Sequence, residues 1–209
     1  MPPLLTDTLS RLRRLAMLDD RVYDELRYES SATLPAVGVT VAGLLALGLG
    51  GWLWWFLSDL GDTGSVFVKT VLLGTIFGLV GWLVWLLIVY VALRQLAGIT
   101  VQVEQLIRTA GFASGVLVIG LAMVITPVGF GIGVLALVAW AGATHIAIER
   151  TVGRGGSVVM AANLLGFAAW LVVMSLLSTG TNQIGPGPFL AEAVWDAING
   201  ISVTLSGIS

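Results

Sequence analysis

The residue best suited to chemistry in this sequence is its single histidine, His145. It lies in a long apolar stretch, and Glu149 follows it four residues later. In a helix this spacing places the two side chains on the same face. A neutral imidazole can be an axial ligand to haem iron or chlorophyll magnesium, so His145 is the candidate cofactor-binding residue. The alternative, which its position near a helix end favours, is a structural histidine hydrogen-bonded to Glu149 or to lipid headgroups.

Other catalytic or metal chemistry is not predicted. There is no cysteine and no second histidine, so the usual ligands of a zinc or di-iron site are missing. The serines and threonines have no histidine or lysine base at a suitable spacing. The GRGGS sequence at 153–157 is Gly-rich like a phosphate-binding loop, but it follows a helix and lacks the lysine. We therefore predict no catalytic residues, no metal site, no enzyme activity, no small-molecule substrate and no nucleic-acid partner.

Four further charged residues are predicted to gather at one membrane surface: Glu104, Arg108, Glu149 and Arg150. We expect them to pair between the third and fourth membrane spans. Ionisable groups deep within a span would indicate a transport path, but these lie at span ends. A small transporter or channel therefore remains an alternative without a polar path to support it.

The elements that position these residues follow from the composition. The chain has 209 residues, of which 57% are hydrophobic and only 11% are charged, and its mean hydropathy is +0.97. A soluble domain carries about 25% charged residues. So few charges cannot cover a water-facing surface, so the composition predicts an all-α, polytopic membrane bundle.

The apolar runs predict five transmembrane helices within a membrane domain of residues 30–178. Their expected ranges are 35–58, 66–93, 111–125, 134–148 and 158–177. The third has only about 15 residues, which is short for a crossing of about 20. A Pro/Gly turn at 126–133 joins it to the fourth span, and paired glycines such as Gly74 and Gly78 predict close helix contacts.

Amphipathic segments flank the membrane domain. In residues 1–29, apolar side chains recur at helical steps over 6–29 and predict one N-terminal surface helix. This helix is either a topology anchor or a docking helix for a partner. Residues 179–209 are predicted to form an outward-facing loop followed by a short amphipathic helix at 188–205.

The distribution of basic residues predicts the orientation. With five spans, nine of the ten Lys and Arg residues lie on the amino-terminal side, and only Lys69 lies at the opposite edge. Cytoplasmic loops carry such an excess. We expect a multi-pass protein of the bacterial cytoplasmic (inner) membrane, with the N-terminus inside and the C-terminus outside.

Tryptophans and one asparagine suggest specific packing. Trp52, Trp54 and Trp55 come at the end of the first span, where an interfacial aromatic belt would place them. Trp82 and Trp85 lie deeper in the second span, and ordinary packing in the bundle is the favoured interpretation. Asn163 in the fifth span is expected to donate an interhelical hydrogen bond.

Three segments resemble bacterial Yip1-domain membrane proteins. They are LDDRVYDELRYESSAT, VEQLIRTAGFASG and ITPVGFGIGVLALVAWAGATHIAIERT, at 18–33, 103–115 and 125–151. With their order and spacing, the likeness covers roughly residues 18–178. The resemblance implies five spans, a cytoplasmic N-terminus and a non-enzymatic role in trafficking, scaffolding or complex assembly. Two departures are Ser114 and Gly115, where a proline is expected, and a longer outward tail.

The function that these observations favour is that of a non-catalytic scaffold or accessory subunit of a larger membrane complex, respiratory or photosynthetic. Its expected partners are other membrane-protein subunits and membrane lipids, including bound lipid. The first alternative, from another class, is a pigment- or haem-binding subunit with His145 as axial ligand to haem or chlorophyll. The second is the small transporter or channel.

Overall fold

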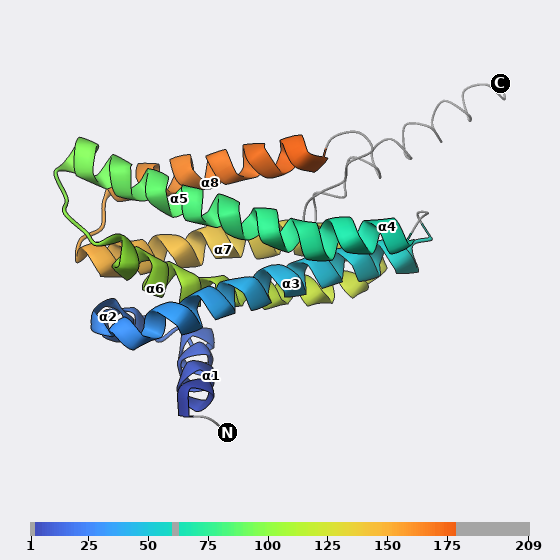
Figure 1. Cartoon of the computed structure of the whole chain (residues 1–209), viewed down its shortest axis with the longest axis horizontal. Coiled ribbons are helices and arrows are strands. Elements are labelled where there is room, and N and C mark those ends of the chain that lie inside the picture. Colours follow the sequence, from blue (N-terminus) through green and yellow to red (C-terminus); the bar gives the residue numbers. More distant parts are fainter. Residues whose placement is uncertain (1–2, 60–62, 179–209) are drawn as a thin grey trace.

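The structure is a computed structural model that describes residues 3–59 and 63–178, and the expected helix at 188–205 lies outside these residues. Five helices are long and apolar enough to cross a membrane, as predicted, and they lie along one axis (Figure 1). They are Ser30–Leu57, Thr63–Ala97, Val103–Val124, Thr126–Val152 and Ser157–Ser178. The chain is thus a multi-pass helical membrane protein.

The amino-terminal segment forms two helices, α1 (Pro3–Ala16) and α2 (Arg21–Tyr28), where a single helix was predicted. Between them Leu18 adopts a left-handed conformation with φ 61°, and the amide of Asp19 bonds the carbonyl of Arg14 at 3.0 Å. The apolar spacing continues through both helices, so periodicity could not reveal the break. Helix α2 lies at one end of the bundle, here called the α2 end, and α1 runs across the direction of the spans (Figure 1).

The first two spans are longer and less regular than their sequences suggest. A short turn at Ser30–Ala32 leads into α3 (Thr33–Leu57). The second span joins α4 (Thr63–Phe67), a π-helical stretch η2 (Val68–Leu73) and α5 (Gly74–Ala97). Its 35 residues come to about 52 Å, well beyond a hydrocarbon core of about 30 Å. Helix α5 ends at Gly98, whose φ of 61° is the usual left-handed helix stop.

The third span crosses the bundle, although its apolar run is short. It begins at α6 (Val103–Ala113), eight residues before the predicted start at 111, and continues as the 3-10 helix η3 (Ser114–Val124). Because a 3-10 helix rises about 2.0 Å per residue, the two 11-residue parts together reach about 38 Å. The polar first turns of α6, rather than lipid-facing residues, supply the missing length.

The last two spans form the rest of the bundle. A single 3-10 turn, η4 (Thr126–Val128), replaces most of the predicted Pro/Gly turn and leads into α7 (Gly129–Val152). The final span is α8 (Ser157–Ser178). The α5–α6 and α7–α8 connections both lie at the α2 end (Figure 1). This end therefore gathers the charged residues that the sequence places around 104–108 and 149–154.

Helix α3 and η3 approach so closely that their backbones touch. A Cβ on Gly50 would lie 1.9 Å from the carbonyl oxygen of Gly120, and one on Gly120 would lie 2.6 Å from Leu47 Cδ1. Nearer the α2 end, a Cβ on Gly111 would lie 2.8 Å from the carbonyl oxygen of Ala36. Such contact between helices in a membrane depends on residues without side chains, because dispersion and shape, not water release, hold the helices together.

Four wholly buried tryptophans fill the space between α5, α7 and α8: Trp82, Trp85, Trp140 and Trp170. Trp140 packs edge-to-face against the rings of Trp85 and Trp170, with centroids about 5 Å apart. Asn163 accepts a hydrogen bond from Trp85 Nε1 and donates one from Nδ2 to the carbonyl of Ala141. The packing role of Trp82 and Trp85 and the interhelical bond of Asn163 are confirmed.

The tryptophans at the far end of α3 do not form a simple interfacial belt. Trp54 and Trp55 are buried, and Trp54 Nε1 donates to the carbonyl of Thr126 at 3.2 Å. Trp52 is half-buried and donates to the carbonyl of Thr63 at 3.0 Å. The belt prediction is wrong for Trp54 and Trp55. The N–H groups of Trp52 and Trp54 instead donate to backbone carbonyls at the starts of the second and fourth spans.

The α3–η3 contact predicts a sharp difference between two glycines of α3. Gly50→Ala should lower the free energy of unfolding by at least about 2 kcal/mol, because its Cβ would meet backbone that cannot rotate away. Gly38→Ala is the control: nothing lies within 4 Å of its Cβ, so its change should stay within about 1 kcal/mol. Denaturant titration in detergent measures both. Equal effects would contradict the close contact.

Candidate functional site

Arg108 attaches α2 to the bundle. It is 7% exposed and lies in the second turn of α6. Its Nε donates to the carbonyl of Leu26 at 3.1 Å, and its terminal nitrogens donate to the carbonyl of Arg27 at 2.7 Å and to Thr33 Oγ1 at 3.4 Å. These two carbonyls belong to the last turn of α2, where a positive charge is favourable. The carbonyl of Leu26 also accepts the amide of Glu29 at 3.3 Å. Arg108 thus completes the end of α2.

Apolar packing and a second arginine reinforce this attachment. Val22 and Leu26 of α2 are wholly buried and pack in one cluster with Phe112 of α6 and Ala147 of α7. Arg150, in the last turn of α7, pairs with Asp20 and reaches Asp24 at 3.7 Å. Helix α2 is therefore held to both the third and the fourth spans.

The predicted charge pairing between the third and fourth spans is wrong. Arg108 bonds the α2 carbonyls, and Arg150 pairs with acidic residues of α2, because α2 packs where the two spans would have exchanged charges. The polar contact between α6 and α7 is instead made by two hydroxyls, Thr109 Oγ1 and Thr151 Oγ1, at 2.7 Å. The sequence placed the charges at the correct end but could not show that α2 returns to them.

Helix α1 is held to the α2 segment by ion pairs. Arg11 bonds Glu29 at 2.5 Å, and Arg14 bonds Asp19 at 2.8 Å and Glu25 at 2.9 Å. The hydrogen bond from Arg14 lowers the pKa of Asp19, and the hydrogen bond from Arg11 lowers the pKa of Glu29. Both carboxyls are partly exposed, so each pair alone is a weak restraint. The position of α1 thus depends on several surface charges acting together.

An apolar groove lies between α1 and the spans. Its volume is about 850 Å³, and residues of α1, α2, α3, α6, η3 and α7 line it. Apart from the hydroxyl of Tyr23, all of its side chains are apolar or are those of glycine. This groove was not predicted, because its walls come from segments more than a hundred residues apart. The amphipathic pattern of α1 was the one sequence signal for an apolar surface here.

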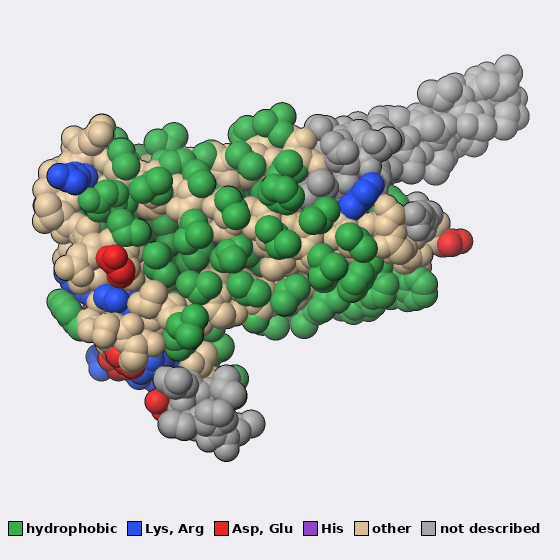
Figure 2. Space-filling view, viewed as in Figure 1, with side chains coloured by type: hydrophobic (Ala, Val, Ile, Leu, Met, Phe, Trp, Pro, Cys, Tyr) green, Lys and Arg blue, Asp and Glu red, His purple; other side chains and the backbone are tan. Residues whose placement is uncertain are grey.

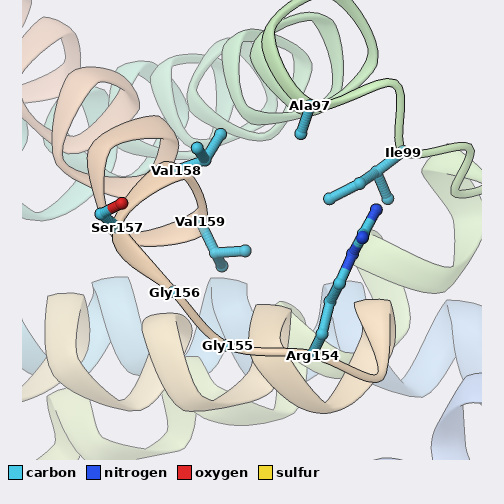
Figure 3. Close-up of a pocket in the computed structure, with 8 residues that line it drawn as sticks. All are labelled: Ala97, Ile99, Arg154, Gly155, Gly156, Ser157, Val158 and Val159. Atoms are coloured by element: carbon cyan, nitrogen blue, oxygen red, sulfur yellow. The ribbon is translucent and has the colours of Figure 1, made fainter.

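A smaller pocket of about 210 Å³ lies at the α7–α8 connection. Arg154 extends from this connection toward Ile99, and the chain continues from its base through Gly155 and Gly156 to Ser157 on the other side of the pocket (Figure 3). Arg154 is exposed and makes no hydrogen bond or ion pair with another residue in the described ranges. We assign the pocket no ligand, because none of its polar side chains is buried.

Charged and apolar surfaces are separated along the bundle. In Figure 2, basic and acidic side chains gather at the α2 end, and apolar side chains cover the length of the spans. Lys69 lies in η2, toward the far end of the second span. This separation is what a bundle needs when its middle faces lipid and one end faces charged headgroups or water.

His145 lies on α7, one turn before Glu149, as expected. Its Nε2 lies 3.4 Å from Glu149 Oε1, and its Nδ1 is buried without a hydrogen-bond partner among the described residues. His145 lines neither the apolar groove nor the Arg154 pocket. These surroundings fit the structural interpretation better than an axial ligand, since one nitrogen faces a carboxylate and the other is enclosed. The pigment ligand stays a prediction.

The interior of the described bundle offers hydroxyls rather than charges. Thr40, Ser114 and Thr151 each donate to a carbonyl one turn earlier in the same span. Arg108 is the one charged residue in the described ranges that is buried, and it lies near the α2 end. A transporter would need a chain of polar groups across the membrane, so the structure adds no support for that alternative.

Comparisons with known proteins found no match to a family, to a curated protein or to a solved structure. The resemblance to Yip1-domain proteins therefore rests on the three sequence segments. The function must be argued from the residues of this chain.

The hydrogen bonds from Arg108 to the carbonyls of Leu26 and Arg27 are here called the clamp. They predict that substituting Arg108 lowers stability more than substituting an exposed arginine. Arg108→Met should lower the free energy of unfolding by at least about 1.5 kcal/mol, because carbonyls at the end of α2 lose charged donors in a buried site. It should also speed proteolysis between residues 28 and 33. Arg94→Met is the control, since Arg94 is exposed and bonds Tyr90 of its own helix. Arg94→Met should change the free energy of unfolding by no more than about 0.5 kcal/mol.

The ion pairs of α1 predict acid-sensitive attachment. A carboxyl whose pKa is lowered in the folded protein stabilises it fully above the ordinary value and loses that contribution as pH falls through the lowered value. The ordinary values for Asp19 and Glu29 are 3.8 and 4.5. We therefore expect α1 to stay attached between about pH 7 and pH 5 and to loosen below the ordinary values.

Spin labels can measure this loosening, because the chain has no native cysteine. Ser10→Cys and Gln95→Cys place one label on α1 and one on α5, both at exposed positions. The distance distribution should broaden on acidification. Asp19→Asn combined with Glu29→Gln should broaden it already at neutral pH. An unchanged distribution in acid would show that apolar contacts alone hold α1.

Proposed function

We propose that this chain is a non-catalytic scaffold or accessory subunit of a larger membrane complex, and that α1 is its docking element. The observation that carries this proposal is the clamp that Arg108 forms on the last turn of α2. The clamp holds the base of α1 to the bundle, while α1 itself runs away from the spans (Figure 1). Leu9 of α1 stays exposed, as do Met17 and Leu18 in the turn after it.

A simple topology anchor would not need this construction. The positive-inside effect requires only that basic residues remain on one side of the membrane. Here a guanidinium is buried, which is costly unless its donors are bonded. Two of its three contacts are to the last turn of α2, and the third is to Thr33 at the start of α3. This burial is understandable if the orientation of α1 matters to a partner.

The location and orientation belong to the same proposal. The α2 end carries Arg94, Arg108, Arg150 and Arg154, which supports its assignment to the cytoplasmic side of a bacterial inner membrane. The C-terminus would then lie outside. A partner in a respiratory or photosynthetic complex would meet α1 at the cytoplasmic surface.

The Yip1-like segments and the described residues both favour action by contact. The resemblance implies trafficking, scaffolding or complex assembly. Among the described residues, no group of three or more His, Cys, Asp or Glu side chains could hold a metal ion. The charged residues at the α2 end are engaged mainly in holding helices together rather than converging on a cavity.

The proposal is tested by gentle purification from native membranes. The intact protein should retain stoichiometric partner subunits, identified by mass spectrometry. Leu9→Glu combined with Met17→Glu should release them, since the two substitutions place charge at exposed apolar positions on α1 and in the turn after it. Leu96→Glu is the matched control, because Leu96 is 70% exposed at the end of α5, away from α1.

Two other results would overturn the proposal. A protein that elutes alone and colourless is not an accessory subunit. An eluate with a tetrapyrrole absorption band that His145→Ala removes would support the pigment-binding alternative instead.

A further inference from the structure

The apolar groove is enclosed on several sides by elements from different parts of the chain. Leu12 and Leu15 of α1 form one wall, and Val39 of α3, Val116 of η3 and Ile146 of α7 lie among the others. Its volume of about 850 Å³ lies within the range of about 300–1,000 Å³ of small-molecule sites. The groove adjoins the lipid-facing surface, because Val118 and Ile146 are both on its lining and exposed.

Small residues keep this space open. Gly142 lies on the lining, and nothing lies within 4 Å of a Cβ built on it. Gly115 faces α1, where its Cβ would lie 2.7 Å from Leu12 Cδ2. Ala139 and Ala143 complete the α7 side. Ordinary bundle packing would place larger side chains at these positions, since a void loses contacts on all its walls.

A buried polar group independently indicates a ligand. Tyr23 of α2 is only 4% exposed and lines the groove, yet its hydroxyl makes no hydrogen bond with another residue in the described ranges. Burial raises the pKa of Tyr23, so the hydroxyl keeps its proton and remains a donor. A tyrosine with a buried ring normally finds an acceptor for its O–H group. The hydroxyl of Tyr23 is not itself enclosed, so it can donate to an acceptor that enters the groove.

We propose that the groove binds one acyl chain of a phospholipid from the leaflet at the α2 end, with an ester carbonyl of that lipid accepting the hydrogen bond of Tyr23. The apolar walls suit the hydrocarbon chain. Arg13 follows Leu12 on α1, is exposed and has no acidic partner among the described residues, so it supplies positive charge for the lipid phosphate.

A protein helix suits the groove less well. With a diameter of about 10 Å, a helix would fill 850 Å³ within about two turns, far less than a membrane crossing. A helix also offers no free backbone carbonyl along its middle for Tyr23. An acyl chain is narrower and carries its ester acceptors at one end. This lipid site goes beyond the proposed docking role and does not depend on it.

Photochemical labelling of the full-length protein tests the site. The probe is phosphatidylglycerol with a diazirine on its acyl chain, in nanodiscs of phosphatidylcholine and phosphatidylglycerol. In the intact protein, peptides with groove residues of α1 and η3 should be labelled more heavily than those with lipid-facing residues of α8 such as Leu165, which is 57% exposed. Equal labelling of both would mean ordinary boundary lipid and would overturn the proposal.

Two glycines of α7 give a matched pair of variants. Gly142→Leu fills the groove and should abolish its labelling while leaving that of α8 unchanged. Gly131→Leu adds the same side chain at another open position outside the groove and should change nothing. Tyr23→Phe keeps the ring and removes the donor, so groove labelling at limiting probe should fall about fivefold, as for one ordinary hydrogen bond.

The same variants distinguish a bound lipid from a bound protein segment. If Gly142→Leu does not fold, Tyr23→Phe still decides, because it adds no volume. Groove labelling that both variants leave unchanged would contradict the proposal. Crosslinks from the groove to a co-purified protein, in place of lipid, would identify a protein partner as the occupant and would also overturn it.

Discussion

The backbone contact between α3 and η3 is the constraint on which the rest of the structure depends. Gly50, Gly111 and Gly120 allow the first and third spans to touch along most of their length. This contact places the start of α6 beside the end of α2, where Arg108 can reach the carbonyls of that helix. Helix α2 in turn fixes the base of α1, and α1 forms a wall of the apolar groove. The close contact between α3 and η3 thus determines how α6, α2 and α1 are arranged at the α2 end.

Arg108 at this end shows how a buried charged donor is satisfied, because each of its hydrogen bonds reaches an oxygen of α2 or α3. The 3-10 helix of η3 satisfies its own backbone and lengthens the span, which lets a short apolar run reach across the bundle. The half-polar turns of α6 can then lie at the bundle end, where Arg108 is bonded and Glu104 is exposed. Among the interior tryptophans, Trp140 and Trp170 donate to Ser114 and to the carbonyl of Gly78, whereas Nε1 of Trp82 is buried without a partner among the described residues.

The sequence predicts the parts of this fold that depend on local composition. Five spans follow from hydropathy, and the role of Asn163 follows from a lone amide in an apolar helix. Prediction from the sequence fails where a segment distant along the chain determines which groups a residue contacts. Arg108 and Arg150 were expected to find charges across two spans, but α2 occupies that place. The break at Leu18 could not be predicted, because the helical spacing of apolar residues continues unchanged from α1 into α2. The groove and the unpartnered Tyr23 exist only once α1, η3 and α7 meet.

The weak restraint on α1 connects the two proposals. Its attachment consists of partly exposed ion pairs, each worth little, and of apolar contacts across a groove that is not filled by side chains. An occupant that touches Leu12 and Leu15 would therefore add to the restraint on the position of α1. If a partner recognises the outer face of α1, lipid in the groove and partner on the surface favour the same orientation. Each then strengthens the binding of the other by the same factor, because coupling between two sites is reciprocal.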